Sequence, residues 1–72
     1  MTYKVILERQ EEGGYTVFVP KLPDVVSEGD TKKEALENIK DAIKGYLETM
    51  EEMGWKPPKI EEETVDVKIT AA

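Results

Sequence analysis

The sequence contains no cysteine and no histidine. Without cysteine the chain can form neither a disulfide nor a thiolate nucleophile. Without histidine it lacks the commonest general base and metal ligand in proteins. Both absences weigh against an enzyme, and we expect no catalytic residue, no metal site and no cofactor.

Long hydrophobic runs are also missing. The apolar stretches are far shorter than the roughly 20 residues that a membrane-spanning helix needs, and the N-terminus shows no signal-peptide pattern. We therefore expect a cytoplasmic protein that makes no contact with a membrane.

Positive charge is scarce, since 10 basic residues face 16 acidic ones and the net charge is −6. Binding to nucleic-acid phosphates needs clustered lysine and arginine, so this composition disfavours it. A basic protein would be the electrostatically complementary partner, although acidity can simply keep a small protein in solution. Glutamate and lysine dominate the charged residues, a balance typical of thermophile proteins.

The 72 residues form a single domain, 1–72. A chain of this size buries only about 60% of the surface that its unfolded form exposes, so its core is thin.

Strict alternation of apolar and polar residues predicts the first strands. Residues 2–9 place Tyr3, Val5 and Leu7 on one face of a strand, opposite Lys4, Ile6 and Glu8. Residues 15–19 place Tyr15, Val17 and Val19 on one face, opposite Thr16 and Phe18. A polar loop ending in Gly13-Gly14 separates the two runs, which predicts an antiparallel hairpin.

Prolines and periodicity define the remaining elements. Pro20 and Pro23 are expected to end the second strand, and residues 25–28 predict a short third one. Apolar residues at three- and four-residue steps predict a helix over 32–53, and alternation returns at 64–70 as a fourth strand. The fold class is therefore α+β, in the order β-β-β-α-β, with one long helix packed on one face of a small sheet. One arrangement pairs the fourth strand with the first.

Local signals mark both ends of the helix. Thr31 is placed to cap the first turn, and Glu34 can reach back to the Thr31 amide as a capping box. Gly29 supplies the flexible backbone for the turn from strand to helix. Gly54 is a natural C-terminal cap, and Pro57-Pro58 prevents the helix from continuing.

A series of short motifs together resembles the HicB antitoxin family. The motifs are Glu12-Gly13-Gly14-Tyr15, Tyr15-Thr16-Val17-Phe18-Val19-Pro20-Lys21-Leu22-Pro23, Ser27-Glu28-Gly29-Asp30-Thr31, Glu34-Ala35-Leu36-Glu37-Asn38 and Tyr46-Leu47. The resemblance covers roughly residues 3 to 58. It implies a partial ribonuclease H-like β-β-β-α-β fold and a protein that binds HicA, a small basic toxin that cleaves messenger RNA, and blocks its active site.

The sequence departs from the family pattern in two places. Asp24-Val25 stands where the family usually has Gly-Cys. The C-terminal DNA-binding segment that full-length members add is missing, so we expect no direct DNA binding. Solo HicB-like domains also exist, and their partner is not evident.

Two surfaces are candidates for a contact with another protein. The first is the outer face of the sheet, where Ile6 and Phe18 point away from the helix with Lys4 and Thr16. The second is an acidic pole at the end of the helix, where glutamates oppose the helix dipole. It consists of Glu48, Glu51, Glu52, Glu61, Glu62 and Glu63. The competing interpretation of both is an ordinary solvated surface.

Three functions follow from these observations. The leading hypothesis is a HicB-like antitoxin, or a solo relative, that occludes a HicA-type toxin. The alternative is a stand-alone oligomeric scaffold or regulatory module without a toxin, in which Ile6 and Phe18 form a homodimer or higher homo-oligomer. A divergent nuclease ranks last, because Asp24, Asp30, Asp41 and Asp66 show no convergent arrangement for a metal.

Overall fold

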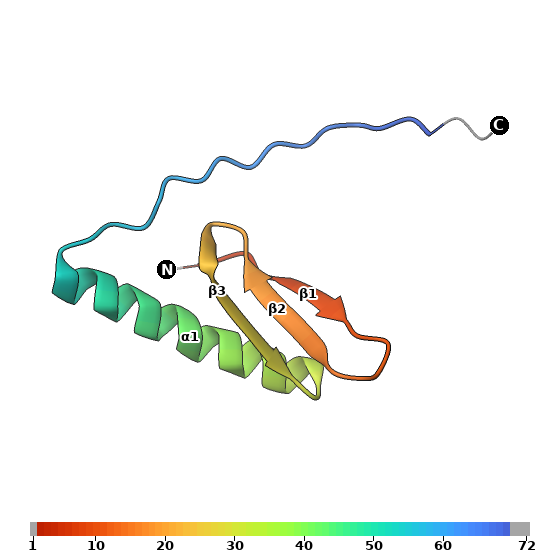
Figure 1. Ribbon diagram of the computed structural model, residues 1–72, viewed down its shortest axis with the longest axis horizontal. Helices are drawn as coiled ribbons and strands as arrows, with labels where there is room; N and C mark the ends of the chain where they lie inside the picture. Colours follow the sequence, from red (N-terminus) through yellow and green to blue (C-terminus); the bar gives the residue numbers. More distant parts are fainter. Residues whose placement is uncertain (1, 70–72) are drawn as a thin grey trace.

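Three antiparallel strands are followed by one long helix. The computed structural model describes residues 2–69, with β1 at Ile6–Arg9, β2 at Tyr15–Val19, β3 at Leu22–Gly29 and α1 at Lys32–Met53. The strands form one sheet in the order β1-β2-β3, and α1 lies across one of its faces (Figure 1). The predicted α+β class, with one helix packed on one face of a small sheet, is confirmed.

Glycines and prolines set the lengths of the strands. Gly13 and Gly14 both have positive φ, 99° and 85°, and close the β1–β2 hairpin as the sequence predicts. β1 is shorter than predicted, because pairing with β2 starts only at Ile6, opposite Phe18. β3 is longer than predicted and contains Pro23. A proline is tolerated there because β3 is an edge strand and its register shifts between Phe18 and Val19.

The core lies between the helix and two of the strands. It consists of Val17, Val19, Leu22, Val25, Ala35 and Ile39, all buried. Tyr3, Val5 and Leu7 are only half-buried and pack against this core from the side of β1. The core is therefore complete under β2 and β3 and thin under β1.

Both ends of α1 have the predicted caps. The Glu34 amide donates to Thr31 Oγ1 at 3.1 Å, and Gly54 has the left-handed φ of 70°. One detail of the capping box was wrong: Glu34 Oε1 accepts from the Asp30 amide at 3.4 Å, one residue before Thr31. The glutamate thus extends the cap into the loop.

Gly29 is required by a close approach between strand and helix. A Cβ atom on Gly29 would lie 2.4 Å from the Ala35 nitrogen and 2.9 Å from the Ala35 Cα. Its φ is not positive. The prediction that Gly29 serves backbone flexibility was therefore wrong, since the missing side chain is what lets β3 pass beneath the first turn of α1.

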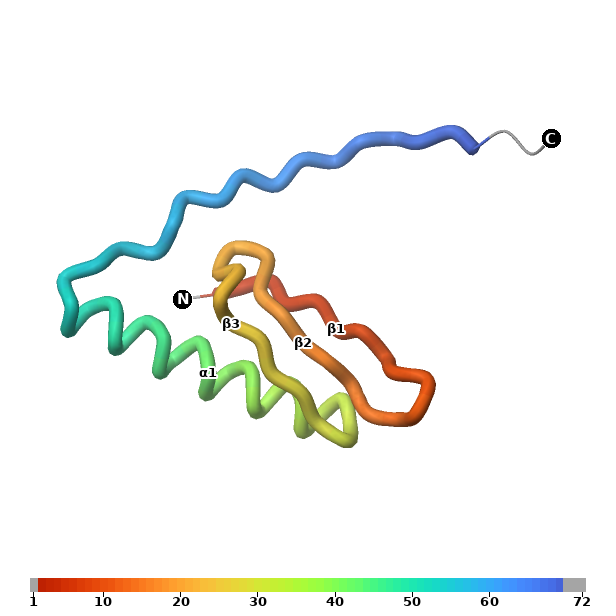
Figure 2. Tube along the Cα trace, viewed as in Figure 1, coloured from red at the N-terminus to blue at the C-terminus, as the bar shows by residue number. Residues whose placement is uncertain are grey.

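The chain after α1 forms no fourth strand within the described residues. Residues 55–69 carry no regular structure and run as a single extended tail (Figure 2). Lys21 in the β2–β3 turn holds the first part of this tail, with its Nζ donating to the Ile60 carbonyl at 2.7 Å. The prediction of a fourth strand at 64–70 is therefore wrong for residues 64–69, and Thr70 lies outside the described residues. The segment is extended, as the alternation of apolar and polar residues predicts, but no neighbouring strand pairs with it.

Candidate protein-binding surface

An apolar row crosses the face of the sheet that points away from α1. Register places Ile6 opposite Phe18 and Phe18 opposite Val26, so one side chain comes from each strand. Ile6 is 40% exposed and Val26 57% exposed, with the half-buried Phe18 between them. No element covers this face within residues 2–69 (Figure 1). The strands therefore present a continuous apolar strip to solvent.

A polar row lies directly beside the apolar one. Glu8 pairs with Thr16 and Thr16 with Glu28, each two residues away from the apolar residue of its own strand. Thr16 Oγ1 accepts a hydrogen bond from Gln10 Nε2 at 3.1 Å, and the same nitrogen lies 3.3 Å from Glu8 Oε1. Two exposed carboxylates thus stand on either side of a fixed hydroxyl, next to the apolar row.

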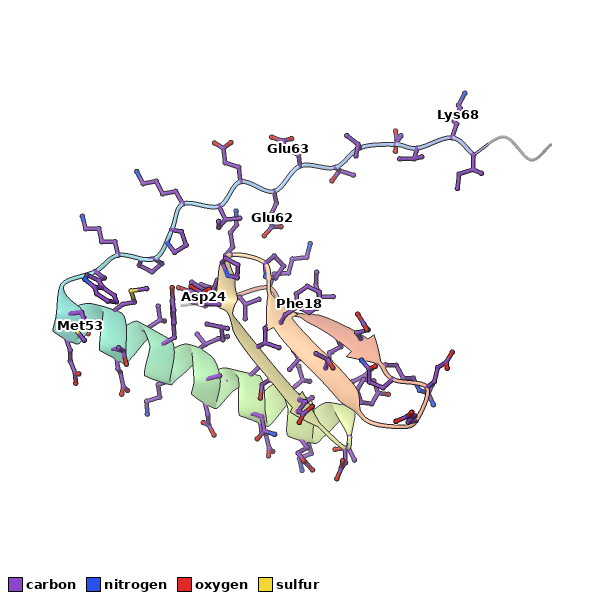
Figure 3. All side chains as sticks on the ribbon, in the orientation of Figure 1. Phe18, Asp24, Met53, Glu62, Glu63 and Lys68 are labelled. Carbon is purple, nitrogen blue, oxygen red and sulfur yellow. The ribbon has the colours of Figure 1, made fainter. Side chains whose placement is uncertain are left out.

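The predicted outer-face residues divide between these rows. Ile6 and Phe18 belong to the apolar row and Thr16 to the polar row. Lys4 is exposed just before β1 and adds a positive charge at the Ile6 end. Figure 3 shows Phe18 on β2 and Asp24 near the start of β3.

Sequence reasoning missed Val26. In the pair Val25-Val26 either residue could face the core, because the two prolines before it hide the alternation. In the structure the pairing of β3 with β2, which has a register shift between Phe18 and Val19, places Val26 on the outer face. Val25 then faces the core and is only 4% exposed. Pairing of Val26 with Phe18 is a long-range property, which no local pattern reports.

The predicted acidic pole is distributed over two segments. Glu48, Glu51 and Glu52 lie exposed near the end of α1, where the last turn holds no basic residue. Glu61, Glu62 and Glu63 belong to the tail, and Figure 3 shows Glu62 and Glu63 away from Met53 at the helix end. Glu62 Oε1 is 4.0 Å from Lys21 Nζ, so it is drawn to the β2–β3 turn. Whether either group of glutamates contacts a partner stays a prediction.

Two further observations concern other classes of function. Among residues 2–69 no three Asp, Glu, His or Cys side chains are grouped so that they could hold a metal ion. No helix in the described chain is long and apolar enough to cross a membrane.

Comparison with known proteins gives consistent matches. Residues 3–70 match the sequence model of a family described as HicB_like antitoxin of bacterial toxin-antitoxin system. A UPF0150 protein of Thermoplasma acidophilum is 45% identical over 67 residues, which cover 93% of this chain and 97% of that protein. That relative comes from a thermophile, in line with the predominance of glutamate and lysine.

Two other relatives extend the comparison. Antitoxin HicB 1 of Photorhabdus laumondii is 40% identical over 76 residues, which cover the whole of this chain and 48% of that protein. A UPF0150 protein of Synechocystis is 46% identical over 48 residues, which cover 67% of this chain and 61% of that protein. The chain thus spans nearly all of the first relative but about half of the longer antitoxin.

Proposed function

Because the chain belongs to the HicB-like antitoxin family of bacterial toxin-antitoxin systems, we propose that it is an antitoxin that binds a small basic HicA-type toxin and covers its RNA-cleaving site. The observation that carries this proposal is the three-strand apolar row Ile6–Phe18–Val26 on an uncovered sheet face. In this proposal the protein acts in the cytoplasm by occlusion, and it carries out no chemistry of its own.

The composition of the outer face suits a protein partner. Interfaces between proteins have an apolar centre, rich in aromatic side chains, and a polar rim. Phe18 lies at the centre of the row, and Ile6 and Val26 flank it. The neighbouring carboxylates of Glu8 and Glu28 supply the rim. A small number of such central residues carries most of the binding energy in a typical interface.

The charge of the chain fits a basic toxin. Exposed carboxylates beside the apolar row, together with the net charge of −6, favour encounter with a positively charged surface. The exposed Glu48, Glu51 and Glu52 offer a second acidic contact on the same molecule. RNA-cleaving proteins bind phosphates through lysine and arginine, so an acidic occluding surface competes with their substrate by charge as well as by shape.

Co-expression with the product of the neighbouring gene tests the proposal. Expression of that product alone should stop growth, and this chain should restore growth and co-purify with it. Val26→Lys should abolish rescue, because it places a positive charge in the apolar row beside Phe18, at a position too exposed to disturb the core. We expect a loss of about 2 kcal/mol or more, which is roughly 30-fold in affinity.

Asp41→Asn is the matched control, since it also raises the net charge by one but lies exposed on the polar side of α1. It should rescue growth as the wild type does. A neighbouring product that is harmless alone, or that fails to co-purify, would contradict the antitoxin function and favour the stand-alone oligomer.

A further inference from the structure

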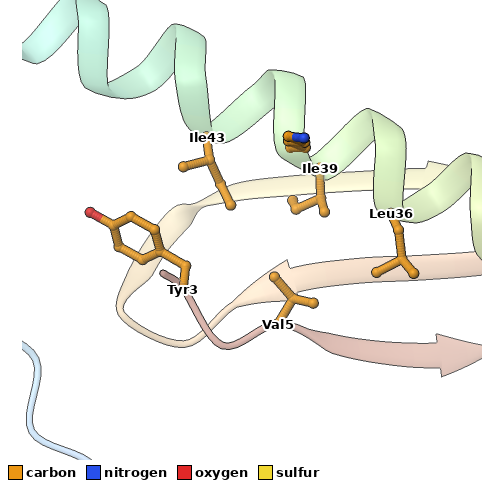
Figure 4. Close-up of a pocket in the computed structure, with 6 residues that line it drawn as sticks. Tyr3, Val5, Leu36, Ile39 and Ile43 are labelled. Carbon is orange, nitrogen blue, oxygen red and sulfur yellow. The ribbon is translucent and has the colours of Figure 1, made fainter. Parts of the chain in front are cut away.

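An apolar groove lies between α1 and the β1 side of the molecule. The helix packs over β3 and β2, and leaves β1 largely uncovered. The groove has a volume of about 240 Å³. It is lined by Tyr3, Val5, Leu36, Ile39, Lys40 and Ile43 (Figure 4). It has room for several aliphatic side chains, and nothing within residues 2–69 occupies it.

The strand beside this groove has a free edge. β1 is the outer strand of the sheet, and the extended residues before Ile6 pair with no other described strand. The opposite edge is partly satisfied, because Asn38 Nδ2 on α1 donates to the Glu28 carbonyl of β3 at 2.7 Å. An open edge of this kind is a template for pairing with another strand.

The tail of the chain is an extended segment with apolar side chains that suit this groove and edge. Val65, Val67 and Ile69 alternate with polar residues and are 81%, 77% and 90% exposed. In an extended segment they share one face, so the tail carries an apolar stripe with no cover. Lys21 holds Ile60 and Glu62 beside its own β2–β3 turn, and from there the tail leads away from α1 (Figure 1).

We propose that two copies of this chain exchange their tails. Residues 64–69 of one copy pair with the free β1 edge of the other, and their apolar stripe fills the groove between β1 and α1. Each chain carries both halves of this contact, so a reciprocal exchange closes a two-fold dimer and leaves neither half exposed. The inference does not depend on a toxin, and the outer face with Phe18 stays free in such a dimer.

Charge disfavours a basic partner in this groove. Residues 64–69 hold one carboxylate, Asp66, and one lysine, Lys68, so the docking segment is net neutral, and the three glutamates 61–63 directly precede it. On the helix the groove continues over Leu36 to Lys32, Lys33 and Glu37, with Lys40 shared between the two parts. Three lysines against one glutamate give this rim a net charge of +2. A basic toxin would be repelled here, whereas a neutral apolar segment preceded by three glutamates is not.

Light scattering after size-exclusion chromatography tests the exchange with two complementary variants. The full chain should run as a dimer. Truncation after Glu63 removes the stripe, and Leu36→Glu adds a negative charge to the groove at a position 38% exposed. Each variant alone should be a folded monomer, as judged by circular dichroism. Thr49→Glu adds the same charge at an exposed helix position outside the groove and should stay dimeric.

The mixture of the two variants is the decisive sample. The truncated chain keeps an intact groove, and the Leu36→Glu chain keeps an intact tail. A one-to-one heterodimer should therefore form, in which the tail of the Leu36→Glu chain docks in the groove of the truncated chain. A monomeric full chain, a dimeric truncated chain, or variants that stay monomeric on mixing would each overturn the proposal. A monomer in which Leu36→Glu speeds amide exchange in residues 64–69 would show that the tail docks on its own chain.

Discussion

Gly29→Ala tests the close contact between β3 and the first turn of α1. The added methyl would meet three backbone atoms at less than 3.0 Å, with the Ala35 nitrogen nearest at 2.4 Å. Backbone cannot rotate away as a side chain can, and Ala35 is itself fully buried at 0% exposure. The strand or the helix must therefore shift.

Such overpacking costs about 1–3 kcal/mol. A 72-residue domain has a total stability of about 4–11 kcal/mol, so this loss is a large fraction of it. At about 4–8 °C per kcal/mol for a domain of this size, the melting temperature should fall by about 4–24 °C.

Gly45→Ala is the matched control, because it makes the same substitution in the same chain. Gly45 lies inside α1, and a Cβ there would meet nothing within 4 Å. Alanine should stabilise the helix by about 0.5–1 kcal/mol and raise the melting temperature by about 2–8 °C. Thermal melts followed by circular dichroism measure both variants. A Gly29→Ala protein that melts at or above the wild-type temperature would refute the close-contact argument.

Two smaller predictions concern α1. Thr31→Ala removes the hydroxyl that accepts from the Glu34 amide, and it should lower the free energy of unfolding in urea by about 0.5–2 kcal/mol. Thr49→Ala on the exposed helix surface should leave the free energy of unfolding unchanged. Equal effects of the two substitutions would argue against the cap. The buried Tyr46 hydroxyl has no hydrogen-bond partner among residues 2–69, so Tyr46→Phe should raise stability by about 1–3 kcal/mol, and Tyr15→Phe should leave it unchanged. Destabilisation by Tyr46→Phe would mean that the hydroxyl is satisfied.

The helix was predictable from the sequence because its signals are local. Thr31 and Gly54 mark its two ends within one turn each, and the structure places α1 at the predicted bounds. The inward faces of β1 and β2 were predictable for the same reason, since alternation directly encodes which side chains share a face. The family resemblance rested on the same stretches, and the match over residues 3–70 confirms it.

The third and fourth strands show where local patterns fail. Pro23 breaks the alternation, but an edge strand needs only one side of its backbone paired, so β3 begins earlier than predicted. Val65 and its neighbours alternate as a strand does. A segment becomes a β-strand only when its backbone pairs with the free edge of another strand. Which edge that is depends on tertiary or quaternary contacts. For the same reason the sequence identified Ile6 and Phe18 but missed Val26.

The absence of native cysteine allows the central claim to be tested by a single introduced thiol. Val26→Cys places a reactive group in the apolar row, and Asp41→Cys places one on the exposed polar side of α1. Alkylation of each variant is followed by the mass of this chain, alone and in the purified complex with the neighbouring gene product. If the outer face binds the toxin, the complex should slow alkylation at Val26→Cys at least tenfold and leave Asp41→Cys unchanged. Equal rates at Val26→Cys with and without the toxin would contradict the account.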